Sequence, residues 1–323
     1  MVWLMLAVGA VVSFGVIAWM LRSGRVGAID LPNERSLHTH AVPRSGGLGV
    51  LAGLSWVFFV HFPIFWPLAV AIMAVAAVSW LDDRHPLPAR VRFATHLLAA
   101  IWLAGCGVFF EAPWWVMGLM VLGVVWLTNL YNFMDGSDGL AGGMALFGFG
   151  AYGLAAWLAG SLPMAALCLA VAGAAAGFLV FNFHPARIFM GDVGAIPLGF
   201  LAGALGLMGV RDGLWHLPFM LLVFSPFIMD ASVTLARRAW RRETLWQAHR
   251  EHYYQRLIQS GWGHARTAWA VYMLMLAVAA CAVSARTAPL NVWVGILLGW
   301  AGVYALLGSL IDRRWRNHQN LGR

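Results

Sequence analysis

Aspartates occur at the ends of three long apolar runs, where a charge is costly. Asp82 and Asp83 follow one run, Asp135 and Asp138 follow a second, and Asp192 follows a third. An ionised carboxylate at the edge of a bilayer core needs a partner, so each of these acids is a candidate for function. Clustered carboxylate oxygens suit a hard cation such as Mg²⁺. The pattern predicts metal-assisted chemistry, provided that the five acids share one side of a membrane.

The spacing within each group of acids suggests how they are presented. Asp135 and Asp138 are three residues apart, which predicts that a helical turn projects both carboxylates from one face. Asn129 and Asn132 continue that polar face back into the preceding apolar run. The alternative for this group is a helix break with two solvated acids. For Asp82–Asp83 the alternative is a solvated helix end, and for Asp192 it is a simple N-terminal cap.

Two further segments have the composition of phosphate-binding sites. Arg44 precedes Ser-Gly-Gly at the start of an apolar run, and a helix N-terminus with glycines and an arginine can hold a phosphate. His249, Arg250 and His252 are close enough in sequence for one turn to present two imidazoles, which could bind phosphate or sugar or move a proton. The alternative is an ordinary positive-inside loop in the first case and an amphipathic surface helix with solvated polar residues in the second. For Asp230, structural pairing and function are equally open.

The elements that must position these residues are apolar helices. The chain is 61% hydrophobic and 11% charged, with a mean hydropathy of +0.75, far from the average of soluble proteins. Runs of the length that crosses a bilayer, about 20 residues, recur along the sequence. The predicted fold class is all-α, a polytopic membrane protein of about eleven transmembrane helices forming a single domain over residues 1–323. The predicted spans are 2–21, 46–62, 64–81, 93–110, 114–131, 141–158, 164–181, 195–210, 216–236, 267–284 and 291–311.

The arginines predict the orientation of these helices. Basic residues follow the first run rather than precede it, which places the N-terminus in the periplasm and the C-terminus in the cytoplasm. With eleven crossings, all but two of the 21 basic residues fall in inside loops, the exceptions being Arg211 and Arg286. Even numbers of crossings then separate the five aspartates, so all of them face the cytoplasm. This bias also accounts for the net charge of +8 without nucleic acid.

The motifs resemble those of the polyprenyl-phosphate N-acetylhexosaminyl-1-phosphate transferases of glycosyltransferase family 4. The resemblance extends over nearly the whole chain. The form His-Arg-x-His-x-Tyr-Gln-Arg is most similar to the branch that initiates O-antigen synthesis. The matching segments are Asp30–His38, Pro43–Gly47, Asp82–Asp83, Asn129–Gly143, Phe189–Gly194 and His249–Arg256.

The resemblance implies a function and a set of roles. A UDP-N-acetylhexosamine would donate sugar-1-phosphate to undecaprenyl phosphate at the cytoplasmic face of the bacterial inner membrane, releasing UMP, with Mg²⁺ or alternatively Mn²⁺ as cofactor. Asp192 and Asp83 would bind the metal. Asp82, Asp83, Asp135 and Asp138 would be catalytic, and the substrates would be bound by Asn129, Asn132, Arg44, His249, Arg250 and His252. The donor is left open among the N-acetylfucosamine, N-acetylquinovosamine and N-acetylglucosamine forms, as is a homodimer.

Departures from the family pattern and a second class of function limit this prediction. Pro86 stands where the peptidoglycan relatives carry a third acid, and His249-Arg-Glu-His252 replaces their run of three histidines. Both differences argue against a muramoyl-pentapeptide substrate. A transporter is the alternative, but it predicts acids near the middle of helices rather than at one face.

The predicted topology can be tested by labelling. Cysteines introduced near Arg242 and His318 should be shielded from an impermeant thiol reagent in intact cells, because both positions lie in predicted inside segments. A cysteine near Leu162 should react. Labelling at the first two positions would contradict both the orientation and the shared face of the aspartates.

Overall fold

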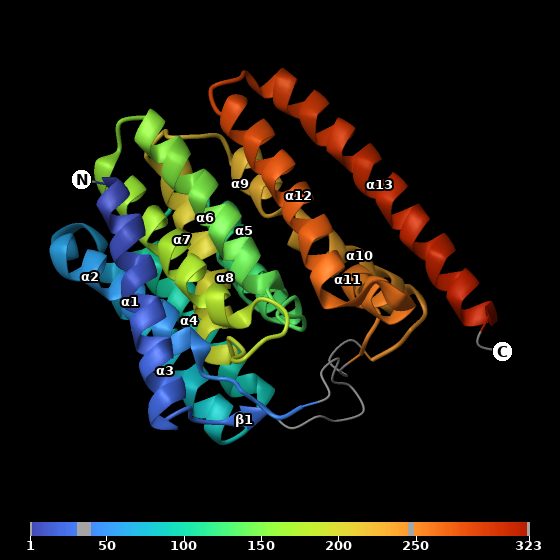
Figure 1. Ribbon diagram of the computed structural model, residues 1–323. Coiled ribbons are helices and arrows are strands. Elements are labelled where there is room, and N and C mark those ends of the chain that lie inside the picture. The colour runs from blue at the N-terminus through green and yellow to red at the C-terminus, as the bar shows by residue number, and fades with distance from the viewer. Residues whose placement is uncertain (1, 31–39, 245–248, 322–323) are drawn as a thin grey trace.

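A computed structural model describes residues 2–30, 40–244 and 249–321 of the chain (Figure 1). These residues are helical apart from loops and one pair of two-residue strands. The helices are α1 Val2–Ser23, α2 Gly46–Val60, α3 Phe62–Arg84, α4 Ala89–Gly105, α5 Trp114–Phe133, α6 Leu140–Leu158, α7 Leu162–Asn182, α8 Asp192–Arg211, α9 Leu217–Val223, α10 Ser225–Trp240, α11 Tyr253–Leu257, α12 Gly263–Ser284 and α13 Leu290–Leu321, with a π-helical turn over Ile258–Trp262.

The helices lie close to the predicted apolar runs, but fewer of them than predicted are long enough to cross a membrane. Among the described residues, eight helices are long and apolar enough to span a membrane, or nine if α9 and α10 form one span. Helix α2 has 15 residues and α4 has 17 residues. Both are short of the roughly 20 residues that a bilayer core requires. The all-α, multi-pass architecture is confirmed, whereas eleven crossings and the orientation stay predictions.

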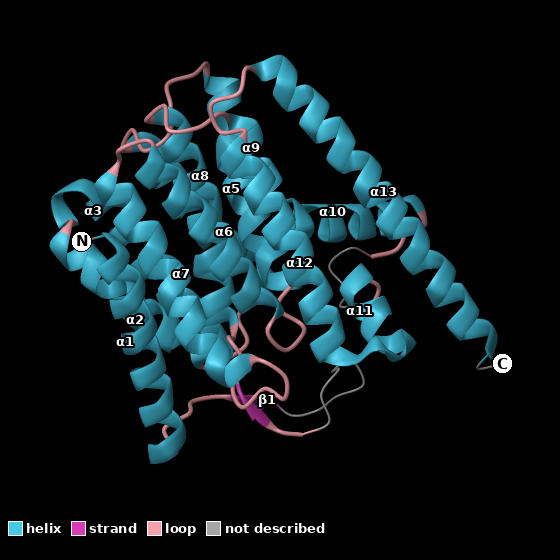
Figure 2. Cartoon of the chain, turned by 45° about the horizontal axis from the view of Figure 1, so that its top comes forward, coloured by secondary structure: helices cyan, strands magenta, loops and turns pink. Residues whose placement is uncertain are grey.

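The run 216–236, predicted to be one helix, is a pair of helices. Helices α9 and α10 meet at Phe224 with a bend of 77°. Pro226 lies in the first turn of α10, where its missing N–H costs nothing but where an uninterrupted helix could not continue unstrained. The prediction of one continuous helix was therefore wrong, whereas a single broken span agrees with the structure. Helix α10 lies at an angle to α12 and α13 (Figure 2).

Helices α7 and α8 form the centre of the bundle. Helix α7 packs against α1 and α6, and α8 packs against α5 and α3 (Figure 1). Small residues allow the closest of these approaches. A Cβ atom at Gly173 of α7 would lie 2.0 Å from the Leu6 carbonyl oxygen of α1, so only glycine fits there. By contrast, α13 lies at the outer edge of the molecule, and most of its residues are exposed.

Loops gather with the strand pair at one end of the helices (Figure 2). Strands β1, Ile29–Asp30, and β2, Val42–Pro43, are antiparallel. The chain after β2 then joins the segment before α8 by backbone hydrogen bonds. Phe189 N–H donates to the Pro43 carbonyl at 2.7 Å, and Gly47 N–H donates to the Met190 carbonyl at 2.8 Å. The start of α2 and the start of α8 are thereby fixed side by side.

Candidate active site

Asp83 connects three of the predicted motifs through its carboxylate. The side chain is buried at the last turn of α3 and accepts hydrogen bonds from the backbone N–H groups of Asp192 at 3.2 Å and Val193 at 2.9 Å. The Arg44 guanidinium also lies 3.2 Å from this carboxylate. A carboxylate is favoured at a helix N-terminus, because the first amides of a helix have no partner within it. Asp83 therefore caps α8 from a neighbouring helix.

Asp82 and Asp192 share an arginine that the sequence did not single out. Arg92 of α4 approaches Asp82 at 2.8 Å and Asp192 at 3.7 Å through the same Nη1 atom. Asp82 also accepts the Leu87 N–H at 2.6 Å, which folds the α3–α4 connection around it. The Asp192 side chain remains 23% exposed. The Arg92 guanidinium thus holds two acids that come from separate helices.

Asp135 completes this group of acids from the α5–α6 loop. No side-chain hydrogen bond or ion pair to it is formed by the residues that the structure describes. Burial raises the pKa of the Asp135 carboxyl well above its usual value, and the nearby carboxylates of Asp192 and Asp83 raise it further, since both effects disfavour a negative charge. The predicted convergence of acids at one end of the helices is therefore found in the structure. We call Asp82, Asp83, Asp135 and Asp192 the aspartate cluster.

The prediction that Asp135 and Asp138 share one face of a helical turn is wrong. Helix α5 ends at Phe133 and α6 begins at Leu140, so both acids lie in the loop between them. Gly139 ends this loop with a φ of 76°. That value lies in the left-handed region that favours glycine. The two carboxylates diverge as a result. Asp135 lies in the aspartate cluster, and Asp138 lies against the α7–α8 loop.

Asp138 is held by two histidines that the prediction missed. His184 Nδ1 lies 2.6 Å from one Asp138 oxygen, which also accepts the Ala186 N–H at 3.2 Å. His264 Nδ1 lies 3.0 Å from the Ser137 hydroxyl and 3.8 Å from the other Asp138 oxygen. The imidazole rings stack with centroids 5.4 Å apart and planes within 5°. His184 is 43% exposed, so this group faces the outside of the loop cluster.

The predicted residues Arg44, Asn129 and Asn132 differ in whether their polar groups already have partners within the protein. Arg44 is engaged with Asp83, although a third of its side chain is exposed. Asn129 donates its side-chain amide to the Val125 carbonyl one turn earlier in α5, at 2.7 Å. Asn132 is partly exposed one turn before Asp135. Motif residues 31–38 lie outside the described residues.

The predicted histidines lie together, held by Asp230. The rings of His249 and His252 are 4.8 Å apart, and His252 is buried. Asp230 of α10 accepts the N–H groups of Tyr253 at 2.8 Å and Tyr254 at 3.0 Å, and it lies 3.2 Å from His252 Nδ1. The open question about Asp230 is thus answered by a positioning role.

The segment His249–Arg256, which we call the histidine segment, also contacts the α5–α6 loop that carries Asp135. The Tyr254 hydroxyl donates to the Phe133 carbonyl at 3.4 Å. It lies so close to Gly136 that a Cβ atom there would be 2.2 Å from it. Arg250 is partly exposed on the same segment. The aspartate cluster and the histidine segment are therefore neighbouring parts of one site.

The donor set of the cluster fits a hard cation that is shared with a substrate. Within the described residues, no three His, Cys, Asp or Glu side chains are arranged to hold an ion by themselves. Mg²⁺ commonly takes one or two carboxylates and completes its shell with water and substrate phosphate. Asp192 is partly exposed, and Asp135 lacks a protein donor among the described residues, so these two acids have oxygens to offer. The carboxylate oxygens of Asp83 already accept hydrogen bonds from the first amides of α8.

Comparison with known proteins identifies the family. Residues 65–210, which contain the aspartate cluster and Asp138, match the family model described as glycosyl transferase family 4. A decaprenyl-phosphate N-acetylglucosaminephosphotransferase of Mycobacterium tuberculosis is 30% identical over 78% of this chain and 74% of its own. The chain belongs to glycosyl transferase family 4. The family resemblance that its motifs predicted is thereby confirmed.

Other relatives indicate where within the family 4 transferases the chain is most similar. A probable undecaprenyl-phosphate N-acetylglucosaminyl 1-phosphate transferase of Bacillus subtilis is 29% identical over 90% of this chain and 87% of its own. A phospho-N-acetylmuramoyl-pentapeptide-transferase of Geobacillus kaustophilus is 36% identical, but over only 55% of this chain and 53% of its own. The match to the Bacillus subtilis protein thus extends over more of this chain than the match to the Geobacillus kaustophilus protein.

Substitution of Asp83 tests its place at the start of α8. Asp83→Asn leaves one carbonyl oxygen for two amide donors and removes the charge opposite Arg44. We expect a loss of about 1–3 kcal/mol in the free energy of unfolding, from unpaired buried groups, and a lower melting temperature of the purified protein in detergent. Asp212→Asn, at the other end of α8, is the control because its pair with Arg211 is partly exposed. Equal melting temperatures for both variants would contradict the capping role.

Proposed function

We propose that the protein transfers N-acetylhexosamine-1-phosphate from a UDP-sugar to undecaprenyl phosphate, producing a lipid diphosphate sugar and UMP. The observation that carries the proposal is the aspartate cluster, assembled with Arg44 and Arg92 at one end of the membrane helices. Two anionic substrates must meet for this reaction, so the site needs charge neutralisation and positioning more than covalent chemistry. Membership of the family and the names of its relatives support the same reaction.

The aspartates provide the oxygens for a divalent cation. We assign Asp192 and Asp135 as the residues that would hold Mg²⁺, or alternatively Mn²⁺, with Asp82 and Asp83 beside them. When bound, the metal would neutralise the diphosphate of the donor and stabilise the departing UMP. Asp83 contributes mainly by fixing the backbone of Asp192, which revises its predicted role as a direct metal ligand.

Cationic side chains around the cluster supply contacts for phosphate. Arg92 and Arg44 are each about one-third exposed while paired with aspartates. A phosphate arriving at the cluster can share these guanidinium groups, because an arginine has several donors in a planar fork. We assign the same task to Arg250, on the segment that Asp230 holds. His252 is buried and therefore orients this segment rather than binding a ligand directly.

The Asp138–His184–His264 group lies on the other side of the α5–α6 loop. Asp138 fixes the Nδ1 side of the His184 ring, and the partly exposed ring is left to face a ligand. We assign this group to the nucleotide part of the donor, since imidazole rings offer both a stacking face and a hydrogen-bonding edge. Asn132 would contribute from α5, whereas the side-chain amide of Asn129 is used within its own helix.

The relatives support a proposal for the sugar and for the cellular context. Their names favour N-acetylglucosamine among the three sugars of the predicted donors. We place the active site on the cytoplasmic face of a bacterial inner membrane, because a nucleotide sugar is a cytosolic substrate. A role in initiating O-antigen or another envelope polysaccharide agrees with the His249–Arg256 motif.

One observation favours the transporter alternative. Helices α9 and α10 form a broken span, and broken helices line the binding sites of many transporters. Asp230 follows the break, as an ion-binding acid would. Its oxygens, however, are occupied by His252, Tyr253 and Tyr254. The break therefore serves to hold the histidine segment.

The identity of the nucleotide product tests the proposed function. Purified protein, undecaprenyl phosphate, Mg²⁺ and a panel of UDP-sugars should yield UMP in equal amount to the lipid product. The reverse reaction should exchange labelled UMP into UDP-sugar, because one phosphoanhydride replaces another of similar energy. UDP as the sole nucleotide product would exclude sugar-1-phosphate transfer, and the absence of any nucleotide product would favour a transporter.

Removal of one carboxylate tests the metal. Asp192→Asn keeps the size of the side chain and removes the charge that an oxygen-preferring cation needs. We expect activity to fall by orders of magnitude with normal membrane insertion, and EDTA should abolish the activity of the parent protein. Asp212→Asn, at the other end of the same helix, should remain active. Full turnover in EDTA would remove the metal from the mechanism.

The raised pKa of Asp135 predicts a pH dependence. Its carboxyl group ionises only as the pH rises through the raised pKa, so activity that needs the ionised form should increase with pH over that range. A bound cation favours the carboxylate, so higher Mg²⁺ concentrations should move the midpoint to lower pH. Activity measured against pH at two Mg²⁺ concentrations checks this. A midpoint that is insensitive to Mg²⁺ would contradict the assignment of Asp135 to the metal.

A further inference from the structure

Asp312, near the end of α13, forms an ion-pair cluster with the histidine segment. Its carboxylate lies 2.7 Å from Arg256 Nη1 and 2.9 Å from Arg237 Nη2. Both guanidinium groups also lie over the ring of Tyr253, at 5.2 Å for Arg237 and 5.6 Å for Arg256. The three charged residues come from α10, α11 and α13, so one carboxylate joins three helices.

Arg256 is turned inward by these contacts. Its side chain is 11% exposed, and its Nε atom donates to the Glu251 carbonyl at 2.8 Å. Arg256 belongs to the His249–Arg256 motif, three of whose side chains were predicted to bind substrate. In the structure this arginine instead ties the segment to α13. A second contact lies beyond it, where Arg314 of α13 donates to the Ser260 carbonyl at 2.8 Å.

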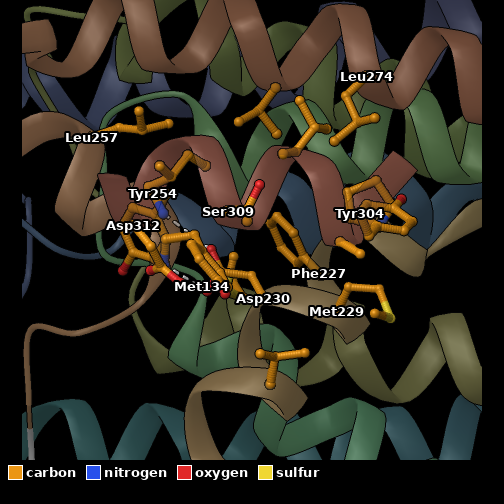
Figure 3. A pocket seen from close by; sticks show the side chains of 18 of the residues that line it. Met134, Phe227, Met229, Asp230, Tyr254, Leu257, Leu274, Tyr304, Ser309 and Asp312 are labelled. Atoms are coloured by element: carbon orange, nitrogen blue, oxygen red, sulfur yellow. Dashed lines mark hydrogen bonds between the residues drawn. The ribbon is translucent and has the colours of Figure 1, made fainter. Parts of the chain in front are cut away.

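Close packing does not hold this side of the segment. A cavity of about 450 Å³ lies between α10, α12 and α13, and Asp230, Tyr254, Leu257 and Asp312 are among the residues that line it (Figure 3). Polar contacts reach across the walls of this cavity. Asp230 supplies those contacts from α10, and Asp312 supplies them from α13.

We propose that Asp312 is a positioning residue that fixes the His249–Arg256 segment against the aspartate cluster. The connection runs from Asp312 through Arg256 to α11, and from Tyr254 of α11 to the Phe133 carbonyl and Gly136, beside Asp135. The segment is thereby held between Asp230 and Asp312. The inference rests on the proposed function, because it concerns the placement of that site's substrate-binding segment.

Kinetics of Asp312 variants test the proposal. Asp312→Asn keeps the shape and removes the charge shared by the two arginines, and we expect kcat to fall by about 10- to 100-fold, the size of effect that slight misplacement of a site produces. Asp312→Glu should keep most of the activity. Asp212→Asn is the matched control, because Asp212 is also paired with an arginine but lies at the far end of α8 from the site. Equal activity of Asp312→Asn and Asp212→Asn would overturn the proposal.

A double-mutant comparison separates positioning from general stabilisation. If Asp312 acts through the histidine segment, Asp312→Asn should cause little further loss in a His252→Ala background. Multiplicative losses in the double variant would overturn the proposal. If Asp312→Asn does not accumulate, Arg256→Lys replaces it, since lysine keeps the charge but lacks the planar fork. Activity of Arg256→Lys equal to the parent would then count against it.

A measurement without substrate distinguishes failure of this inference from failure of the proposed function. Hydrogen–deuterium exchange of the Tyr253 and Tyr254 amides should be faster in Asp312→Asn than in the parent or in Asp212→Asn. Unchanged exchange would overturn the positioning role whatever reaction the protein catalyses. Faster exchange in Asp312→Asn, together with a parent protein that releases no UMP, would instead reject the proposed function alone.

Discussion

Mutual repulsion of carboxylates is the constraint on which the site depends. Four aspartates are brought together at the edge of an apolar bundle, where weak screening strengthens their repulsion. Three of them are compensated by neighbouring groups. The amides at the start of α8 and Arg44 stabilise Asp83, and Arg92 is shared by Asp82 and Asp192. Asp135 alone has no such partner among the described residues, which makes it the acid with most to gain from a bound cation.

The tight junction between α2 and α8 makes this arrangement possible. A Cβ atom at Gly47 would lie 2.3 Å from the Gly194 backbone nitrogen, so the two helix starts meet backbone to backbone. A Cβ atom at Gly191, whose φ is 72°, would lie 2.3 Å from the Arg44 carbonyl oxygen. Larger residues would separate Arg44 from the first turn of α8. The glycines of both motifs therefore set the distance between opposite charges rather than leaving room for a ligand.

The sequence was sufficient to predict the helices and the meeting of the acids. Apolar runs identify helices strongly. The structure brings Asp82, Asp135 and Asp192 together, whereas the count of eleven crossings from which their meeting was predicted stays a prediction. The local conformation of the loops was harder to predict from the sequence. The three-residue spacing of Asp135 and Asp138 places both side chains on one face only inside a helix. Both residues lie instead in the loop that ends at Gly139.

Contacts between distant segments could not be predicted. His264 reaches Asp138 from far along the chain, and Arg92 reaches Asp192 from another helix. Neither residue has a spacing that relates it to the acids. A family resemblance indicates which residues matter but does not show which of them touch, so the hydrogen bonds from the start of α8 to Asp83 could not be predicted.

The bend before α10 has a consequence for the depth of the site. A helix turned by 77° from α9 runs close to the plane of the bilayer wherever α9 crosses it. Trp240 at its end is 90% exposed, and tryptophan side chains settle at the level of lipid headgroups. We expect α10 to lie along this boundary if α9 crosses the bilayer. Asp230 lies on α10 and holds the His249–Arg256 segment, so the bend would set that segment at the height where the lipid phosphate and the nucleotide of the proposed reaction meet.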